Sequence, residues 1–159
     1  MGSRQMEEKR PNLFKEAVER TPDIQNGYRI GLKALKGKDA GCVTAENTRM
    51  VDGSVDVDAC TRDLYPNEAR WDYVVGYRGC AYFLEVHPAH TCNVKEMIKK
   101  AEWLRNWLTM QAPALKTLQN GKSLYWVPSG KHNILPNSPQ SRMLAQSHIL
   151  LVGKLKLSE

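Results

Sequence analysis

A β-hairpin is predicted by residues 71–87, which read WDYVVGYRGCAYFLEVH. Both halves are rich in β-branched and aromatic residues, and only Arg78 and Gly79 separate them. A two-residue turn would place Asp72 directly opposite Glu85, on the same face of the sheet. A three-residue loop would shift the pairing by one position and separate the two acids. The hairpin and its register therefore decide whether this chain carries a paired-carboxylate site.

Opposed carboxylates predict a cation between the two strands. Like charges directly opposite one another destabilise a sheet, so the pair indicates a metal ion or another positive group in that position. The alternative interpretation is two exposed acids on a solvated strand face. The other face of the hairpin is predicted to form a core layer from the pairs Trp71/Val86, Tyr73/Leu84 and Val75/Tyr82.

Composition is typical of a soluble globular protein. The chain has 159 residues, of which 42% are hydrophobic and 25% charged, so residues 11–159 are expected to form one domain. Residues 1–10 are expected to be poorly ordered, with Met-Gly-Ser as a cloning remnant. No apolar run reaches membrane-spanning length, so we expect a cytoplasmic protein without membrane contact. The net charge of +6 is compatible with an anionic partner.

The cysteine pattern argues against two classes of small stabilised fold. None of the four cysteines has CxxC spacing, which disfavours a structural zinc site. A disulfide framework is not expected at this length without a signal peptide. Free thiols are therefore predicted for Cys42, Cys60, Cys80 and Cys92.

The remaining segments predict helices packed on a mixed central sheet, an α/β fold. Helices are expected where apolar residues recur with helical spacing, and strands where β-branched residues alternate or cluster. Asp52-Gly53 is predicted as a turn, and Asn93 with Glu96 as a capping box. The expected elements are a helical region from Pro11 to Lys36 interrupted near Pro22, a strand at Ser54–Cys60, a helix from Asn93 that ends by Pro113, a strand at Leu124–Val127, a short helix at Ser141–His148 and a strand at Ile149–Leu157.

This element order resembles the PD-(D/E)xK nuclease superfamily, with the likeness covering Leu13 to Val127. Asp72 stands at the position of the motif aspartate, and Glu85-Val86-His87 stands at the position of the (D/E)xK tripeptide. Two positions depart from the motif, because Trp71 replaces the proline and His87 replaces the lysine. The resemblance implies a divergent member with a restriction-endonuclease-like core, acting as a nuclease on DNA.

A displaced lysine is available on the following helix. The superfamily tolerates migration of its lysine to this helix, and a helical wheel places Lys100 at the edge of the apolar face, between Met97 and Leu104. Lys99 points well away from that face. Lys100 either reaches the carboxylate pair or extends its ammonium to solvent. His87 shares the strand face of Glu85 and is the alternative cation; otherwise it is a partly buried histidine with a backbone partner.

The predicted chemistry is metal-dependent phosphodiester hydrolysis. Asp72 and Glu85 are predicted metal ligands, because carboxylate oxygens suit Mg²⁺ or Mn²⁺, with water and substrate phosphate completing the shell. Lys100 or protonated His87 would orient the attacking water or neutralise developing charge. The candidates for an additional acid at the site are Glu16, Glu19 and Asp56. The alternative for each is a solvated charge on a helix or strand.

Two other functions remain open from the sequence. The first is a catalytically inactive nuclease-fold module that binds nucleic acid or protein. The second is an interaction protein that uses exposed tryptophans to form a homodimer or to dock a partner. Trp103, Trp107 and Trp126 could also stack on bases, although core packing is the favoured interpretation. Metal binding through the acidic pair would separate the enzyme from the inactive module.

Overall fold

A five-stranded mixed β-sheet forms the centre of the structure, a computed structural model that describes residues 10–158. The strands lie in sequence order, β2-β3-β4-β5-β6. The pairs β2–β3 and β3–β4 are antiparallel, whereas β4–β5 and β5–β6 are parallel. Parallel neighbours require crossover connections, which contain α4 (Val94–Met110) and α6 (Pro139–Gln146) here. The bounds are β2 Val51–Asp56, β3 Tyr73–Tyr77, β4 Cys80–His87, β5 Leu124–Pro128 and β6 Ile149–Leu151.

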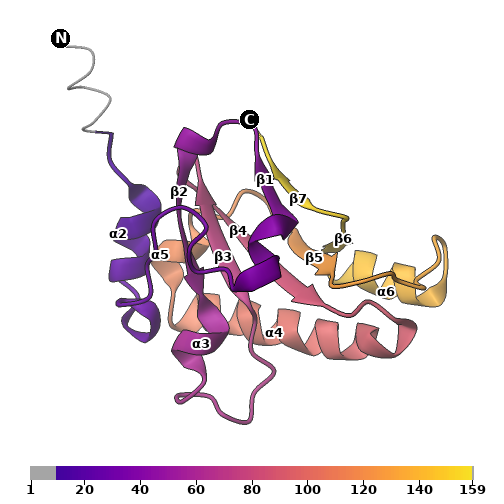
Figure 1. Cartoon of the computed structure of the whole chain (residues 1–159). Helices are drawn as coiled ribbons and strands as arrows, with labels where there is room; N and C mark the ends of the chain where they lie inside the picture. Colours follow the sequence, from indigo (N-terminus) through magenta and orange to yellow (C-terminus); the bar gives the residue numbers. More distant parts are fainter. Residues whose placement is uncertain (1–9, 159) are drawn as a thin grey trace.

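Helices cover one face of this sheet, and a second small sheet covers part of the other. Figure 1 shows α4 running along the large sheet, with α2 and α5 near one end of α4 and α6 near the other. The small sheet pairs β1 and β7 in parallel. Its strands are β1 Val43–Ala45 and β7 Leu155–Leu157; the helices are α2 Leu13–Glu19, α3 Val57–Thr61, α4 Val94–Met110, α5 Pro113–Lys116 and α6 Pro139–Gln146; the 3₁₀ turns are Pro22–Ile24, Gly37–Cys42, Thr48–Met50 and Thr91–Asn93. The α/β fold with a mixed sheet and flanking helices is therefore confirmed.

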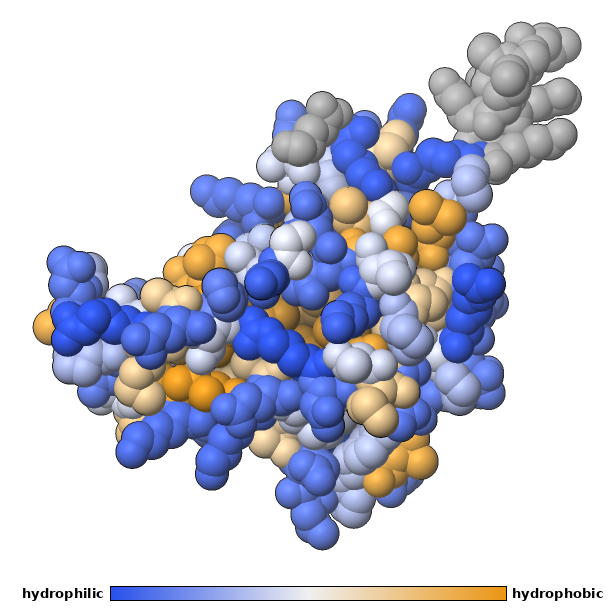
Figure 2. All heavy atoms as spheres, turned by 180° about the vertical axis from the view of Figure 1, so that it is seen from behind, coloured by the Kyte–Doolittle hydropathy of each residue, from blue (hydrophilic) through white to orange (hydrophobic). Residues whose placement is uncertain are grey.

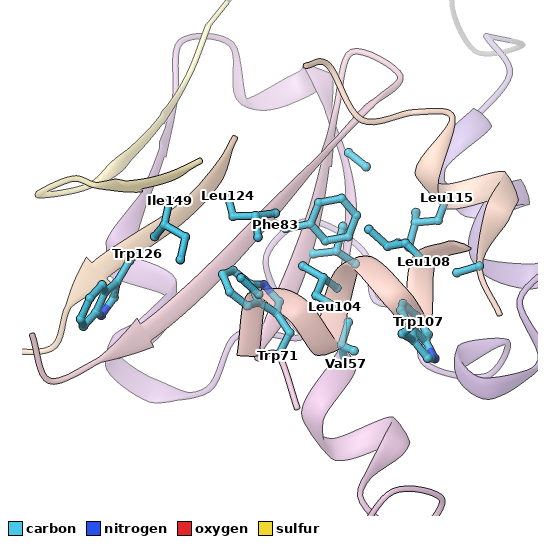
Figure 3. Close-up of a cluster of buried hydrophobic side chains, with 14 of the residues drawn as sticks. Val57, Trp71, Phe83, Leu104, Trp107, Leu108, Leu115, Leu124, Trp126 and Ile149 are labelled. Carbon is cyan, nitrogen blue, oxygen red and sulfur yellow. The ribbon is translucent and has the colours of Figure 1, made fainter. Parts of the chain in front are cut away.

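Two apolar cores follow from the alternation of side chains along the strands. The helix-side core contains Val74, Phe83 and Trp126 from the sheet, together with Leu104 of α4. Figure 3 shows Phe83 and Leu104 at the centre of this cluster, near Trp71. The opposite core lies beneath β1 and β7 and includes Tyr73, Val75, Leu84, Val127 and Leu155.

Trp71 corrects one detail of the predicted hairpin faces. It was expected beside Tyr73 on one face, but it is fully buried in the helix-side core, while Tyr73 lies in the opposite core. The reason is that β3 begins at Tyr73, so strand alternation does not extend back to Trp71.

The predicted second helix between Pro22 and Lys36 is wrong. After the 3₁₀ turn Pro22–Ile24, Arg29 forms an isolated antiparallel bridge with Ser54. Gly31 has a φ of 56°, in the left-handed region that interrupts a helix. The apolar residues of this segment therefore contact the core from irregular backbone rather than from a helix face.

One predicted turn and two predicted strands are also corrected. Asp52-Gly53 lies inside β2 at a bulge instead of forming a turn, and Val57–Thr61 is the helix α3. Asp56 caps that helix by accepting a hydrogen bond from the Ala59 N–H at 2.9 Å, so the predicted strand Ser54–Cys60 ends at Asp56. The predicted strand Ile149–Leu157 is divided into β6 and β7, which belong to different sheets.

The start of α4 differs from the predicted capping box. The helix begins at Val94, and Asn93 makes no side-chain cap to it. The reciprocal cap instead joins His90 and Asn93 around the preceding 3₁₀ turn. Residues 1–9, which belong to the segment expected to be poorly ordered, lie outside the described residues. Arg10, the last residue of that segment, donates to Asp52 Oδ1 at 2.8 Å.

Candidate active site

The hairpin brings Asp72 and Glu85 together at its open end. Tyr73 pairs with Leu84, and the same register continues to the turn, so the predicted two-residue turn is confirmed. Arg78 and Gly79 have φ values of 51° and 80°, as a type I′ hairpin turn requires. The Asp72 N–H donates to Glu85 Oε1 at 3.0 Å. Each strand thus orients the acid of its neighbour through the backbone.

Asp72 is held in the same way as Glu85. Its Oδ2 accepts a hydrogen bond from the Val86 N–H at 3.1 Å. Its own carbonyl accepts from the Val57 N–H at 2.8 Å, which ties this end of the hairpin to the start of α3. Backbone donors therefore fix one oxygen of each carboxylate and leave the other oxygen for a cation or a proton.

Lys100 of α4 supplies a cation to this pair. Its Nζ lies 3.1 Å from Glu85 Oε2 and donates to the Arg70 carbonyl at 3.1 Å. The side chains of Glu85 and Lys100 are only 1% and 14% exposed, so water screens this ion pair little. The predicted reach of Lys100 is confirmed, and Lys99 is exposed, as the helical wheel predicts.

Burial and mutual repulsion perturb the two acids. Burial raises the pKa of Asp72, although the Val86 N–H and the Lys100 charge oppose this shift. Burial and the Asp72 charge raise the pKa of Glu85 well above its ordinary value, against the opposing effect of Lys100. Burial alone would lower the pKa of Lys100, but the negative charges of Glu85 and Asp72 raise it. The cluster therefore keeps its ammonium, and its two acids hold a proton more readily than ordinary carboxyl groups do.

A network that the sequence analysis missed supports this cluster from α3. Asp58 Oδ1 accepts from Arg70 Nε at 2.8 Å, and the Arg70 carbonyl is the second partner of Lys100. The Arg70 side chain also donates to the Tyr65 carbonyl at 2.7 Å. Since Asp58 was expected on a strand, the sequence pattern pointed it toward the wrong neighbours.

His87 lies beside Glu85 but has a second carboxylate partner. Its Nδ1 is 3.9 Å from Glu85 Oε2, and its Nε2 is 3.3 Å from Glu96 Oε2. The side chain is 23% exposed. His87 therefore bridges β4 to the first turn of α4, farther from Glu85 than Lys100 is.

The three additional predicted acids do not join the pair. Glu16 and Glu19 are exposed on α2, which packs Phe14 against Gly76 near the turn end of the hairpin. Asp56 caps α3 and lies 3.3 Å from the ammonium of Lys36. Among residues 10–158, no cluster of three or more acidic, histidine or cysteine side chains is suited to a metal.

The donor set is compatible with a magnesium site of two carboxylates. Mg²⁺ is commonly held by one or two carboxylates, with water and substrate phosphate as further ligands. Within the described residues, Glu85 Oε2 is buried and accepts no aligned hydrogen bond; its contact with Lys100 is an ion pair. Asp72 and Glu85 would hold the ion, and Lys100 would have to share or release this oxygen.

The tryptophans do not form an exposed interaction surface in the described part of the chain. Trp107 and Trp126 are 3% and 0% exposed, and Trp103 is half-buried and stacked on Trp107 at 5.7 Å. On the face seen in Figure 2, apolar residues form small separate patches between hydrophilic ones. Core packing, the favoured interpretation of these tryptophans, is confirmed for Trp107 and Trp126.

Comparisons with known proteins give no relative for this chain. No family model, curated protein or solved structure matches it. None of the helices within residues 10–158 has the length and apolar character needed to cross a bilayer.

Proposed function

We propose that this chain is a divalent-metal-dependent nuclease that hydrolyses DNA phosphodiester bonds through Asp72, Glu85 and Lys100. The observation that carries the proposal is the ammonium of Lys100, 3.1 Å from a buried carboxylate whose neighbour is a second carboxylate. A stable fold gains little from two acids and a lysine buried together, because desolvation opposes their attraction. Strongly perturbed groups in such a cluster are typical of functional sites.

The arrangement of elements also supports a restriction-endonuclease-like core. The order on which the resemblance rests is helix, strand, hairpin, helix and strand, present here as α2, β2, β3–β4, α4 and β5. The motif acids lie at the open end of the hairpin, and the displaced lysine comes from the helix that follows. The proline and lysine of the motif remain absent from their usual positions.

Each residue has a distinct role in the proposed reaction. Asp72 and Glu85 would hold Mg²⁺ or Mn²⁺, which supplies Lewis-acid polarisation of the phosphoryl oxygen and lowers the pKa of water. Lys100 would donate hydrogen bonds to the attacking water or to the phosphoryl oxygens, neutralising charge that develops in the transition state. His87, with Glu96 as its second partner, would tune the charge around Glu85.

A plasmid-nicking assay with Mn²⁺ tests the proposal. Lys100→Met keeps the apolar stem and removes the charge, so we expect cleavage to fall by about a hundredfold or more. His87→Ala should reduce cleavage less, and Lys99→Met on the exposed side of α4 should cleave like the parent. If His87→Ala is the more damaging change, His87 is the cation instead.

The inactive binding module is the second candidate. Its supporting observation is the Lys100–Glu85 ion pair, which already compensates one buried charge without a metal. A parent protein that binds DNA in the presence of a chelator but never nicks it, at any Mn²⁺ concentration, would favour this module over the nuclease.

A further inference from the structure

Within residues 10–158, one part of the large sheet is only partly covered on the face opposite α4. β1 and β7 cover the region around Tyr73, Val75 and Leu84. A row of side chains beside that region, formed by Tyr82 of β4, Tyr125 of β5 and Leu150 of β6, is only partly buried. Tyr125 pairs with Leu150 in the sheet register, and Leu150 is 45% exposed. The row thus presents aromatic and aliphatic surface across three strands.

The two tyrosines lie close enough to act together. Their ring centroids are 6.2 Å apart, with an angle of 43° between the ring planes. A tyrosine phenol is uncharged at neutral pH, and burial raises the pKa of Tyr82 further. An aromatic pair on a sheet can accept stacked bases.

A groove beside this row has a cationic rim. Its volume is about 690 Å³, and its lining comprises Tyr125, Val152, Gly153, Lys154, Leu155 and Lys156. Lys154 and Lys156 are exposed, and no carboxylate belongs to the lining. The segment that leads from β6 to β7 therefore places two ammonium groups beside an aromatic surface.

We propose that the groove between Tyr125 and the Lys154–Lys156 segment binds single-stranded nucleic acid. The bases would stack on Tyr125 and Tyr82, and the backbone phosphates would contact the two lysines. Stacking on aromatic side chains combined with phosphate contacts is the usual means of binding unpaired strands. Tryptophans in the sequence suggested stacking at other positions, but Trp107 and Trp126 are buried in the helix-side core.

This binding surface is separate from the candidate active site. Glu85 is the neighbour of Trp126 in the sheet register, and Trp126 belongs to the helix-side core, whereas the adjacent Tyr125 faces the other way. The inference goes beyond the proposed nuclease, because stacking and phosphate contacts need neither a metal nor cleavage.

Fluorescence anisotropy with a labelled oligo-dT of about ten nucleotides tests the inference. EDTA in the buffer prevents cleavage, so the result is independent of the nuclease proposal. Tyr125→Leu retains apolar burial and removes stacking, so we expect affinity to fall roughly 5- to 100-fold. Tyr125→Phe is the matched control and should bind like the parent. Melting temperatures of both variants establish that they fold.

The lysines are tested through the salt dependence of binding. Changing both Lys154 and Lys156 to Gln should make the slope of log affinity against log salt shallower by about 1.4, since each phosphate contact contributes roughly 0.7 on a single strand. Lys116→Gln, an exposed change on α5, is the control and should leave the slope unchanged. The inference is overturned if the parent does not bind oligo-dT at low salt, if it binds duplex equally well, or if the Tyr125→Leu protein binds like the parent.

Discussion

Lys100→Met is the most informative single perturbation of this molecule, because it removes the only cation in contact with Glu85 among residues 10–158 other than the more distant His87. Methionine preserves the apolar stem that packs along α4. The change leaves two buried acids without their nearest compensating charge. Removing one partner of a buried ion pair costs about 3–5 kcal/mol, which in a domain of this size corresponds to a fall in melting temperature of roughly 6–20 °C.

The size of this loss should depend on pH in a defined direction. Since burial and the charge of Asp72 raise the pKa of Glu85, the folded protein binds this proton more tightly than the unfolded chain does. Stability therefore falls as pH rises from the ordinary carboxyl range toward the raised pKa. Lys100 limits that fall in the parent. Its removal should cost little near pH 5, where Glu85 can take up a proton, and most at about pH 8.

Thermal unfolding without metal at these two pH values measures the effect. Lys99→Met is the matched control, because the same change on the exposed side of α4 should alter stability by less than about 0.5 kcal/mol. Adding Glu85→Gln to Lys100→Met should recover part of the loss at the higher pH. An equal loss at both pH values, unchanged in the double variant, would refute the electrostatic account and leave packing as the explanation.

Three further outcomes are expected. Asp72→Asn and Glu85→Gln should each weaken Mn²⁺ binding by about a hundredfold or more, judged against the 10- to 100-fold losses seen for outer groups, while the metal-free melting temperature holds or rises; unchanged affinity in calorimetry would exclude the metal site. DNA affinity should fall about tenfold or more between roughly 50 and 200 mM salt in a filter-binding assay, and a flat response would indicate another class of partner. Gly76→Ala places a Cβ 2.3 Å from Phe14 Cγ, so it should cost about 1–3 kcal/mol at every pH; a stability unchanged in chemical denaturation would mean that α2 can shift away from the hairpin.

Strong local patterns made the hairpin and α4 predictable. The hairpin has two clear β-rich halves around a short turn, and the apolar stripe of α4 fixes which lysine reaches the strands. The helix predicted for residues 22–36 is wrong because tertiary contacts, including the Arg29–Ser54 bridge, hold the apolar residues of this segment in irregular backbone. The strand prediction is wrong at Val57–Thr61 because alternating valines and aspartates fit a strand as well as a capped helix.

The candidate site was predictable only in part. Asp72, Glu85 and Lys100 come from the hairpin and the following helix, where register and helical spacing determine direction. The Arg70 carbonyl that holds Lys100 lies in a loop, and its side-chain partner Asp58 depends on α3. No periodicity in the sequence specifies such contacts, so the support around the site had to come from the structure.

The parallel pairing of β1 with β7 joins residues 43–45 to residues 155–157, which lie 112 positions later in the chain. Leu155 and Leu157, which complete the core around Tyr73, Val75 and Leu84, therefore join it only after residues 155–157 have left the ribosome. Contacts between such distant segments form slowly, because a long loop must close before any contact compensates the lost entropy. During synthesis, this apolar face of a completed hairpin would be open to chaperones or to other nascent chains. The contacts of the same hairpin with α4 can form once residues 94–110 have been synthesised. The two faces of one sheet would therefore be buried at different times.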